Sequence, residues 1–245
     1  MKPIRIVLKQ LLPPIFWGIG RQIKQFRKRN QKHYFSINGL DQKLEKYLPK
    51  TGGFFVELGA NDGINQSNTL YFERYKGWRG VLIEPTPHNY LKCLANRLAE
   101  NHIFCNACVS FDYSDRFVEI VFANLMSSPV GLESDVKDPV SHAHSGRQFL
   151  ESTDQIFTFG AIAKTLNTIL LESQSPKKID LLSLDVEGAE IEVLKGIDHH
   201  QYRFSYLCIE CRDLDKLSAY LLQHDYQMID QLSSHDYLFK DMRLN

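Results

Sequence analysis

Apolar and polar positions alternate along the chain in two rhythms from residue 53 onward. Short apolar runs predict strands at 53–58, 80–84, 102–109, 179–188, 206–211, 226–230 and 236–240. Apolar positions at helical spacing predict helices at 65–76, 87–100, 189–197 and 214–225. Strands that alternate with helices in this way predict an α/β fold, with a mostly parallel sheet and helices on both faces. Ligands of such sheets bind at the carboxyl ends of the strands.

One segment, at about residues 111–160, interrupts this alternation. The run at 116–124 predicts an extra strand, as one half of a hairpin. Residues 125–149 are polar and contain Gly, Pro and Ser, which predicts a long loop. A short strand and a helix follow at 157–173. Long loops in compact domains are usually functional lids or disordered segments, so this insertion is a candidate lid.

Length and composition are those of a globular protein with unevenly placed charge. The chain has 245 residues, of which 43% are hydrophobic and 24% charged, and its formal net charge is zero. This fits one α/β domain at 33–245 with a short extension at 1–32. Of the 29 Lys and Arg residues, nine lie within 1–32, so the remainder holds 20 basic against 29 acidic residues. The neutral total gives no reason to expect a nucleic-acid partner.

Residues 1–32 form a basic arm with an apolar centre. Lys9 and the pair Pro13-Pro14 interrupt the apolar stretch, which is too short for a bilayer span of about 20 apolar residues. The arm also lacks the small-residue cleavage site of a signal peptide. Either it packs on the domain, or Ile15, Phe16 and Trp17 enter a membrane interface while basic residues meet anionic head groups. We expect a cytoplasmic protein, peripheral at the inner face of the membrane on the second interpretation.

Five cysteines include two C-x-x-C pairs, Cys105 with Cys108 and Cys208 with Cys211. Both pairs lie in predicted strands, where positions i and i+3 point to opposite faces. Neither pair therefore has the geometry of a zinc site. We expect free, reduced and buried thiols.

The turn after the first strand reads Glu57-Leu-Gly59-Ala-Asn61-Asp62-Gly63. A dinucleotide-binding turn has the pattern G-x-G-x-x-G, whereas this turn has two glycines and two acidic residues. Acidic groups beside a pyrophosphate would repel it. A ligand with a cationic amino group and no phosphate fits better, and S-adenosylmethionine is such a ligand.

A second acidic residue, Glu84, ends the neighbouring strand. We expect Glu84 to accept hydrogen bonds from the ribose hydroxyls of this ligand, while Glu57 meets its ammonium group and Gly59 approaches its methionyl part. An acidic residue here can also cap the following helix, as Asp62 does on the alternative interpretation. Two acidic residues in register on neighbouring strands favour ligand binding.

Two segments carry a family resemblance, FFVELGANDGINQSNTLYFERYKGWRGVLIEPTPHNYLKCLANR at 54–97 and IDLLSLDVEGAEIEVLKGI at 179–197. Together they resemble the FkbM-type methyltransferases over roughly residues 50–200. The resemblance implies a class I, Rossmann-like fold with a seven-stranded sheet. It also implies S-adenosylmethionine-dependent O-methylation, often of sugar hydroxyls in glycans, and suggests a role in polysaccharide biosynthesis. By position, the cofactor residues are Glu57, Gly59, Asn61, Asp62, Gly63 and Glu84.

Methyl transfer to a hydroxyl needs in-line alignment and an acceptor for the hydroxyl proton. Asp185 and Glu187 end the fourth predicted sheet strand, beside the expected methyl group, and Asp185 is the candidate base. Asp185 with Glu210 could instead hold Mg²⁺ through oxygen ligands. His142 and His144 in the long loop are further candidate bases, because an unperturbed histidine titrates near neutral pH.

Two other functions fit parts of this pattern. A Rossmann-type NAD-dependent oxidoreductase is disfavoured by the missing third glycine. A non-catalytic membrane-surface protein with a methyltransferase fold is disfavoured because Glu57, Glu84 and Asp185 are all present. The sequence thus predicts a methyltransferase with a sugar or glycan acceptor, and it contains no signal for the oligomeric state.

Overall fold

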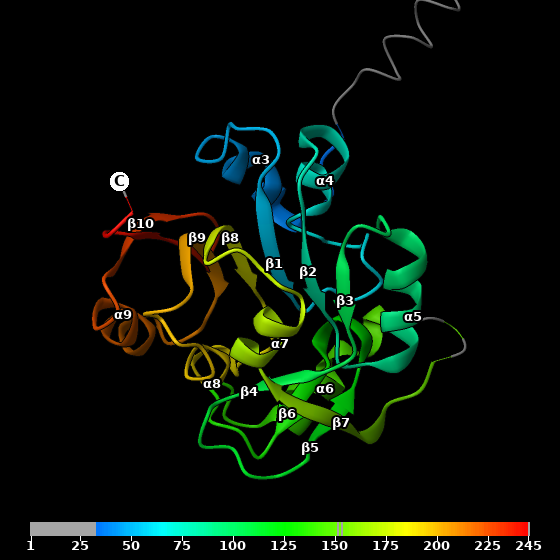
Figure 1. Ribbon diagram of the computed structural model, residues 1–245. Helices are drawn as coiled ribbons and strands as arrows, with labels where there is room; N and C mark the ends of the chain where they lie inside the picture. The colour runs from blue at the N-terminus through cyan, green and yellow to red at the C-terminus, as the bar shows by residue number, and fades with distance from the viewer. Residues whose placement is uncertain (1–32, 151, 153, 245) are drawn as a thin grey trace, which may run out of the picture. The chain divides into compact units, whose positions relative to one another are not determined.

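The computed structural model describes residues 33–150, 152 and 154–244. Its centre is a seven-stranded sheet in the order β10-β11-β9-β8-β1-β2-β3 (Figure 1). Neighbours from β3 to β9 are parallel, whereas β11 is antiparallel to both β9 and β10. The predicted sheet is therefore confirmed. Its strands are β1 (Phe54–Leu58), β2 (Arg79–Ile83), β3 (His102–Phe104), β8 (Lys178–Leu184), β9 (Arg203–Glu210), β10 (Tyr226–Gln231) and β11 (Asp236–Asp241).

The chain changes direction across the sheet between β1 and β8. Strands β2 and β3 are added on one side of β1, whereas β8, β9, β10 and β11 lie on the other side. In the pairing of β1 with β8, Glu57 is opposite Ser183 and Leu58 is opposite Leu184. A switch of this kind leaves a crevice at the carboxyl ends of the two central strands, where ligands of open α/β sheets bind.

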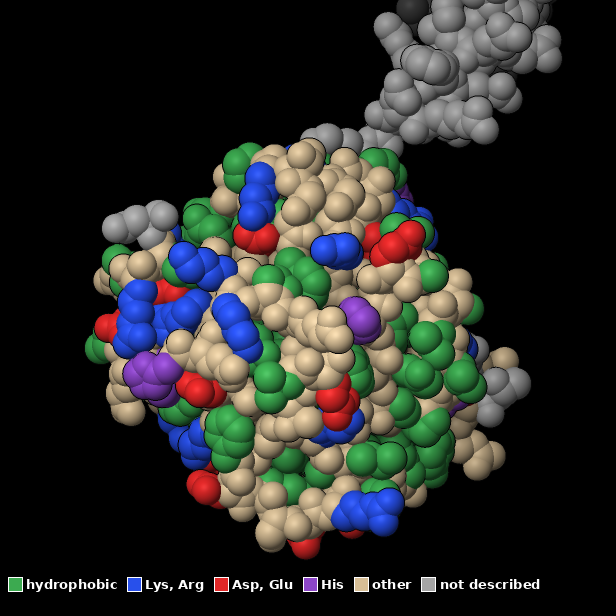
Figure 2. Space-filling model, viewed as in Figure 1, with side chains coloured by type: hydrophobic (Ala, Val, Ile, Leu, Met, Phe, Trp, Pro, Cys, Tyr) green, Lys and Arg blue, Asp and Glu red, His purple; other side chains and the backbone are tan. Residues whose placement is uncertain are grey.

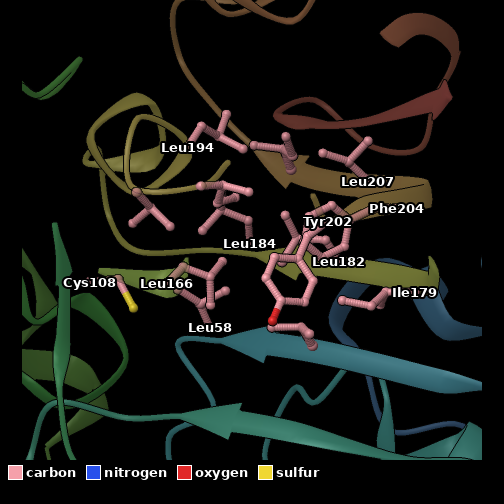
Figure 3. Packing of buried hydrophobic residues seen from close by; sticks show 14 of the residues in the cluster. Leu58, Cys108, Leu166, Ile179, Leu182, Leu184, Leu194, Tyr202, Phe204 and Leu207 are labelled. Atoms are coloured by element: carbon pink, nitrogen blue, oxygen red, sulfur yellow. The ribbon is translucent and has the colours of Figure 1, made fainter. Parts of the chain in front are cut away.

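Helices cover both faces because alternate residues of each central strand point to opposite sides. Val56 and Leu58 of β1 pack with one hydrophobic cluster, and Phe55 packs with the other, so Glu57 points to the same face as Phe55. Figure 3 shows the first cluster, where leucines of β8 and β9 meet Leu166 and Leu194. This face carries α7 (Leu166–Glu172), α8 (Glu190–Leu194) and α9 (Leu214–Leu222), and the other carries α3 (Leu40–Glu45), α4 (Leu70–Lys76) and α5 (Pro87–Asn96).

The insertion forms a second sheet, so the prediction of a long loop at 125–149 was wrong. The order is β4-β7-β5-β6, from β4 (Ala107–Val109), β7 (Phe157–Thr165), β5 (Phe117–Phe122) and β6 (Ser128–Val130). Antiparallel pairing of β5 with β6 confirms the predicted hairpin. The remaining insertion contains η2 (Asn124–Met126), α6 (Pro139–Ser145) and η3 (Gly146–Phe149). Neighbouring residues start α6, because the Asp138 side chain accepts a hydrogen bond from the Ser141 amide and Pro139 is the first helical residue.

The predicted strand at 102–109 is two strands in different sheets. β3 pairs with β2 as far as Phe104, whereas β4 pairs with β7 from Ala107 onward. The break falls at Cys105 and Asn106, the two residues between β3 and β4. All five cysteines are free, and Cys105 at the break is the one that is not fully buried.

Helix α5 presents an apolar side to solvent. Leu91, Leu94 and Leu98, the last just beyond the helix, are 63%, 44% and 53% exposed, while Cys93 is buried against the sheet. Figure 2 shows hydrophobic side chains gathered on the side of the molecule where α5 and β7 lie. The helix thus covers the sheet with one side and leaves a row of leucines uncovered by the described chain.

The basic arm at 1–32 lies outside the described residues, and both interpretations of it stay predictions. Within the part of the chain that the structure describes, no helix combines the length and the apolar character needed to cross a membrane.

One further short element, a 3₁₀ turn, completes the described chain. The turn η1 (Ile37–Gly39) leads into α3, and Asn38 within it has a left-handed backbone at φ 55°. Ile37 and Asn38 both line the cavity described below. The start of the described chain therefore contributes to the wall of that cavity.

Candidate active site

A cavity of about 350 Å³ opens at the carboxyl ends of β1, β2, β8 and β9. Gly59, Glu84, Asp185 and Glu210 line it from these four strand ends. The insertion supplies another part of the wall through residues of β5, η2, β6 and η3. Ligand pockets typically measure about 300–1,000 Å³, so the volume suits a small molecule. The cavity lies at the switch point of the sheet, where the sequence predicted the ligand.

The turn after β1 depends on left-handed backbone at Gly59 (φ +77°) and Asn61 (φ +46°). The amides of Gly59 and Ala60 donate to the carbonyl of Ile83 at 3.1 and 3.2 Å. A Cβ on Gly59 would overlap the carbonyl oxygen of Asp185, so only glycine lets β1 and β8 approach this closely. Gly59 and Asn61 both line the cavity, at the positions predicted to contact the cofactor.

Glu84 is 5% exposed and lines the cavity next to this turn. Its Oε2 accepts a hydrogen bond from the Asn61 amide at 2.9 Å, and its Oε1 accepts one from the Thr86 amide at 2.8 Å. Burial raises the pKa of Glu84 above its usual value, and these hydrogen bonds oppose the rise. Each carboxylate oxygen can accept a second hydrogen bond, so Glu84 is positioned to receive ligand hydroxyls.

Glu57 does not line the cavity. It is 3% exposed, and its carboxylate accepts hydrogen bonds from Ser67 Oγ (3.0 Å), the Asn68 amide (2.9 Å), Thr69 Oγ1 (2.6 Å) and Arg97 Nη1 (3.1 Å). The alternation along β1 turns Glu57 toward α4, beneath the loop that precedes this helix. The structure therefore does not support direct contact of Glu57 with an ammonium group, because its oxygens are already occupied.

Asp62 and Gly63 also lie behind the cavity wall. Asp62 Oδ1 accepts hydrogen bonds from the amides of Ile64 and Asn65, both at 2.8 Å, so it closes a turn and does not cap α4, whose N-cap is Thr69. Gly63 has φ +80°, and a Cβ there would lie 3.0 Å from Cys93 Sγ. Both residues shape the turn, and neither is among the residues that line the cavity.

Arg97 is a buried residue that the sequence patterns did not identify. Its Nε lies 2.7 Å from Glu73 Oε2, and its Nη1 lies 3.1 Å from Glu57 Oε2. These partners are 24 and 40 residues away in the chain, so no local spacing could have indicated the pairs. Removing one partner of a buried ion pair leaves an uncompensated charge, so the three residues depend on one another.

The other end of the cavity carries several carboxyl groups and a guanidinium. Asp185 and Glu187 follow β8, Glu210 ends β9, and Arg212 comes two residues later. Arg212 Nη2 lies 3.0 Å from Glu187 Oε2 and 3.4 Å from Glu210 Oε1. Glu187 has φ +55° and Gly188 has φ +109°, so the chain turns sharply here. The sequence predicted the turn and the acidic residues but not Arg212.

Burial raises the pKa values of two of these carboxyl groups. Burial, followed by the charges of Glu210 and Glu187, raises the pKa of Asp185 well above its usual range. Burial, with repulsion from Glu187, raises the pKa of Glu210 to about 7, although Arg212 opposes the rise. A carboxylate with a raised pKa is a stronger proton acceptor near neutral pH. This end of the cavity therefore suits removal of a proton from a ligand.

His142 belongs to α6 and not to the predicted loop. Its Nε2 lies 2.7 Å from Glu187 Oε2 and 3.5 Å from Arg212 Nη2. His144 is exposed on the same helix and is not among the lining residues, whereas His235, which precedes β11, is. The structure thus brings His142 to the acidic end of the cavity through Glu187 and leaves His144 apart from it.

The structure does not support the predicted Mg²⁺ site on Asp185 and Glu210. Across the described ranges, no group of three or more His, Cys, Asp or Glu side chains is arranged to hold a metal ion. Arg212 already places a positive charge beside Glu187 and Glu210. The charge compensation that a cation would bring is therefore supplied in part by a side chain.

When only the seven strands of the large sheet are counted along the chain, their order in the sheet is 3-2-1-4-5-7-6. A ligand-sized cavity lies at the switch point of this sheet. This arrangement is the class I, Rossmann-like methyltransferase fold. Residues 57–239 match the family model of the methyltransferase FkbM domain, and the chain belongs to this family. The curated relative "Methyltransferase sdnD" of Sordaria araneosa is 30% identical over 166 residues, which are 61% of this chain and 62% of the relative.

Solved methyltransferase structures are more distant. A methyltransferase from Geobacter sulfurreducens has a TM-score of 0.41 at 13% identity, and the match covers 98% of this chain and 95% of that protein. An S-adenosylmethionine-dependent methyltransferase from Aquifex aeolicus has a TM-score of 0.37 at 11% identity, with 82% and 87% covered. Family membership therefore rests on the sequence match.

Proposed function

We propose that this protein is an S-adenosylmethionine-dependent O-methyltransferase whose acceptor is a sugar hydroxyl of a glycan or glycoconjugate. The observation that carries the proposal is the single cavity in which Gly59, Glu84 and Asp185 meet. Membership in the FkbM methyltransferase family supports the methyl transfer. The acceptor is inferred from the resemblance and from the polar lining of the cavity.

The β1 and β2 ends of the cavity suit the cofactor. Glu84 has free lone pairs for two ribose hydroxyls, and the Asn61 amide holds its carboxylate in place. Gly59 leaves the backbone uncovered where β1 ends, so a methionyl chain can pass close to it. When bound, S-adenosylmethionine supplies an electrophilic methyl group with a neutral sulfide as leaving group.

The β8 and β9 ends suit the acceptor. Asp185 lines this end of the cavity directly after β8, where its carboxylate would accept the proton of the acceptor hydroxyl. Arg212 holds Glu187 and Glu210 around the reacting position, which restricts the orientation of the acceptor. Asp185 is the proposed base, and Glu187 orients its neighbours.

The acceptor side of the cavity has the hydrogen-bonding groups that a sugar requires. Ser233, Ser234 and His235 line this side, whereas Asn124 lies beside Asn61, whose Nδ2 donates to Asn124 Oδ1 at 3.0 Å. Amide and hydroxyl side chains can donate to and accept from sugar hydroxyls. Membrane-surface contact through residues 1–32 and a cytoplasmic location extend the same proposal, because a basic arm would bring the enzyme to lipid-linked acceptors.

Binding calorimetry followed by an activity screen tests the proposed function. The protein should bind S-adenosylhomocysteine with micromolar affinity and NAD hardly at all. A panel of nucleotide sugars and lipid-linked glycans should then contain an acceptor that yields S-adenosylhomocysteine and a methylated hydroxyl. Binding of NAD alone would point to an oxidoreductase. Binding of neither ligand would point to a non-catalytic protein.

A further inference from the structure

The loop between β1 and α4 places an amide side chain with an unused oxygen in the cavity wall. Asn68 lines the cavity and is 9% exposed. Its Nδ2 donates to Ser183 Oγ at 3.0 Å, but its buried Oδ1 has no hydrogen-bond partner among the described residues. Buried polar atoms in native proteins nearly always have a partner, and each exception calls for an explanation. A ligand with an N–H or O–H group would complete this site.

The structure holds Asn68 firmly from two sides. Its backbone amide donates to Glu57 Oε1 at 2.9 Å, and the same carboxylate accepts from Ser67 and Thr69 on either side. Ser183, whose hydroxyl accepts the hydrogen bond from Asn68 Nδ2, is directly opposite Glu57 in the pairing of β1 with β8. The amide side chain is therefore held at one position without a ligand, and a site ordered in advance loses little entropy on binding.

The strand order indicates which part of the ligand meets Asn68. Glu84 ends β2, on one side of β1, whereas Ser183 lies on β8, on the other side. A cofactor whose ribose lies at Glu84 therefore extends across Gly59 toward Asn68 with its amino-acid part. That part carries an ammonium group, and hydrogen bonds from charged donors are the stronger kind.

We propose that Asn68 Oδ1 accepts a hydrogen bond from the α-ammonium group of S-adenosylmethionine, and that Glu57 is a positioning residue that holds Asn68. This inference rests on the proposed function, because it requires the cofactor in this cavity. It also gives Glu57 a role that its buried position permits. The carboxylate acts on the ligand through the loop and not by direct contact.

Calorimetry with two ligands tests the proposal. The first is S-adenosylhomocysteine, and the second is its analogue with hydrogen in place of the α-amino group. Asn68→Ala should weaken binding of the first by about 10-fold to 100-fold, as expected for loss of a hydrogen bond to a charged donor. It should leave binding of the second almost unchanged. Equal weakening of both ligands, or no weakening of either, would overturn the proposal.

Two further variants separate the ligand contact from a loss of structure. Asn68→Asp keeps an acceptor oxygen and should bind S-adenosylhomocysteine at least as tightly as the parent, so weak binding like that of Asn68→Ala would count against the proposal. Asn96→Ala removes an amide that donates to the Asp62 carbonyl at 2.8 Å from outside the cavity lining, and it should cause a much smaller loss. Glu57→Gln should weaken binding of the first ligand more than binding of the second. If Glu57 had a purely structural role, the substitution would weaken binding of both ligands equally. If the parent itself fails to bind S-adenosylhomocysteine, the proposed function falls together with this inference.

Discussion

Replacing Gly59 with alanine is expected to force apart the two central strands of the sheet. A Cβ at this position would overlap the carbonyl oxygen of Asp185 and lie 3.1 Å from its carbonyl carbon. Both groups belong to the backbone, so neither can rotate away as a side chain would. The amide of Asp185 donates to the carbonyl of Leu58 at 3.4 Å, and separation of the strands would break this hydrogen bond.

Two costs contribute to the expected destabilisation. Gly59 has φ +77°, and left-handed backbone costs an L-residue about 1–2 kcal/mol. Overpacking of a closely packed position costs a further ~1–3 kcal/mol. The free energy of unfolding should therefore fall by about 2–5 kcal/mol, which is a large part of the roughly 5–15 kcal/mol of a typical domain. For a domain of this size the Tm should fall by about 4–20 °C.

Gly77→Ala provides a matched control. Gly77 has φ +65°, but a Cβ there would meet no atom within 4 Å, so only the backbone cost of about 1–2 kcal/mol applies. Urea-induced unfolding of both variants and the parent, followed by tryptophan fluorescence, measures the difference. Gly59→Ala should also lose binding of S-adenosylhomocysteine, whereas Gly77→Ala should keep it. Equal destabilisation by the two substitutions would refute the close-approach argument.

Two further predictions concern the ends of the cavity, and a third concerns Glu190 at the start of α8. Glu84→Ala should weaken the binding of S-adenosylhomocysteine by about 1.5–3 kcal/mol in calorimetry, and an unchanged affinity would show that Glu84 does not contact the ribose. Asp185→Asn should lower turnover by about 10²–10⁴-fold with little change in cofactor affinity, and full turnover would place the base elsewhere. Burial raises the pKa of Glu190 from 4.5 to about 7, so the folded protein keeps a proton that the unfolded chain loses, and the free energy of unfolding falls as pH rises through this window. Glu190→Gln should therefore gain stability over the parent in urea unfolding at pH 8 but not at pH 4, and an equal difference at both pH values would contradict this.

The sequence located the residues at the strand ends with good accuracy. Gly59, Asn61, Glu84, Asp185 and Glu210 all line the cavity, because the carboxyl ends of neighbouring parallel strands meet at one edge of the sheet. This needs only the strand pattern and the position of each residue after its strand.

Side-chain direction was harder to predict than position. Glu57 was assigned to the cofactor because it ends a strand, yet the alternation along β1 turns it toward the α4 face and away from the cavity. Asn68, eleven residues later, lines the cavity instead. The pattern contained no signal for Asn68, because its position depends on the loop that Glu57 and Arg97 hold together.

By itself, the sequence determined the parallel sheet, the helices on its two faces and the edge at which ligands bind, since hydrophobic periodicity and glycine turns are local properties of the chain. Only the tertiary structure decided that residues 102–109 divide between two sheets and that the insertion forms a wall of the cavity. It also decided the ion pairs of two arginines. Arg97 pairs with acidic residues far away in the sequence, and Arg212 pairs with acidic residues at the ends of two neighbouring strands. These features depend on contacts between segments that the pattern treats as independent. Folding brings each buried charge next to its partner. The attraction between the two is stronger inside the protein than it would be between the same segments in water.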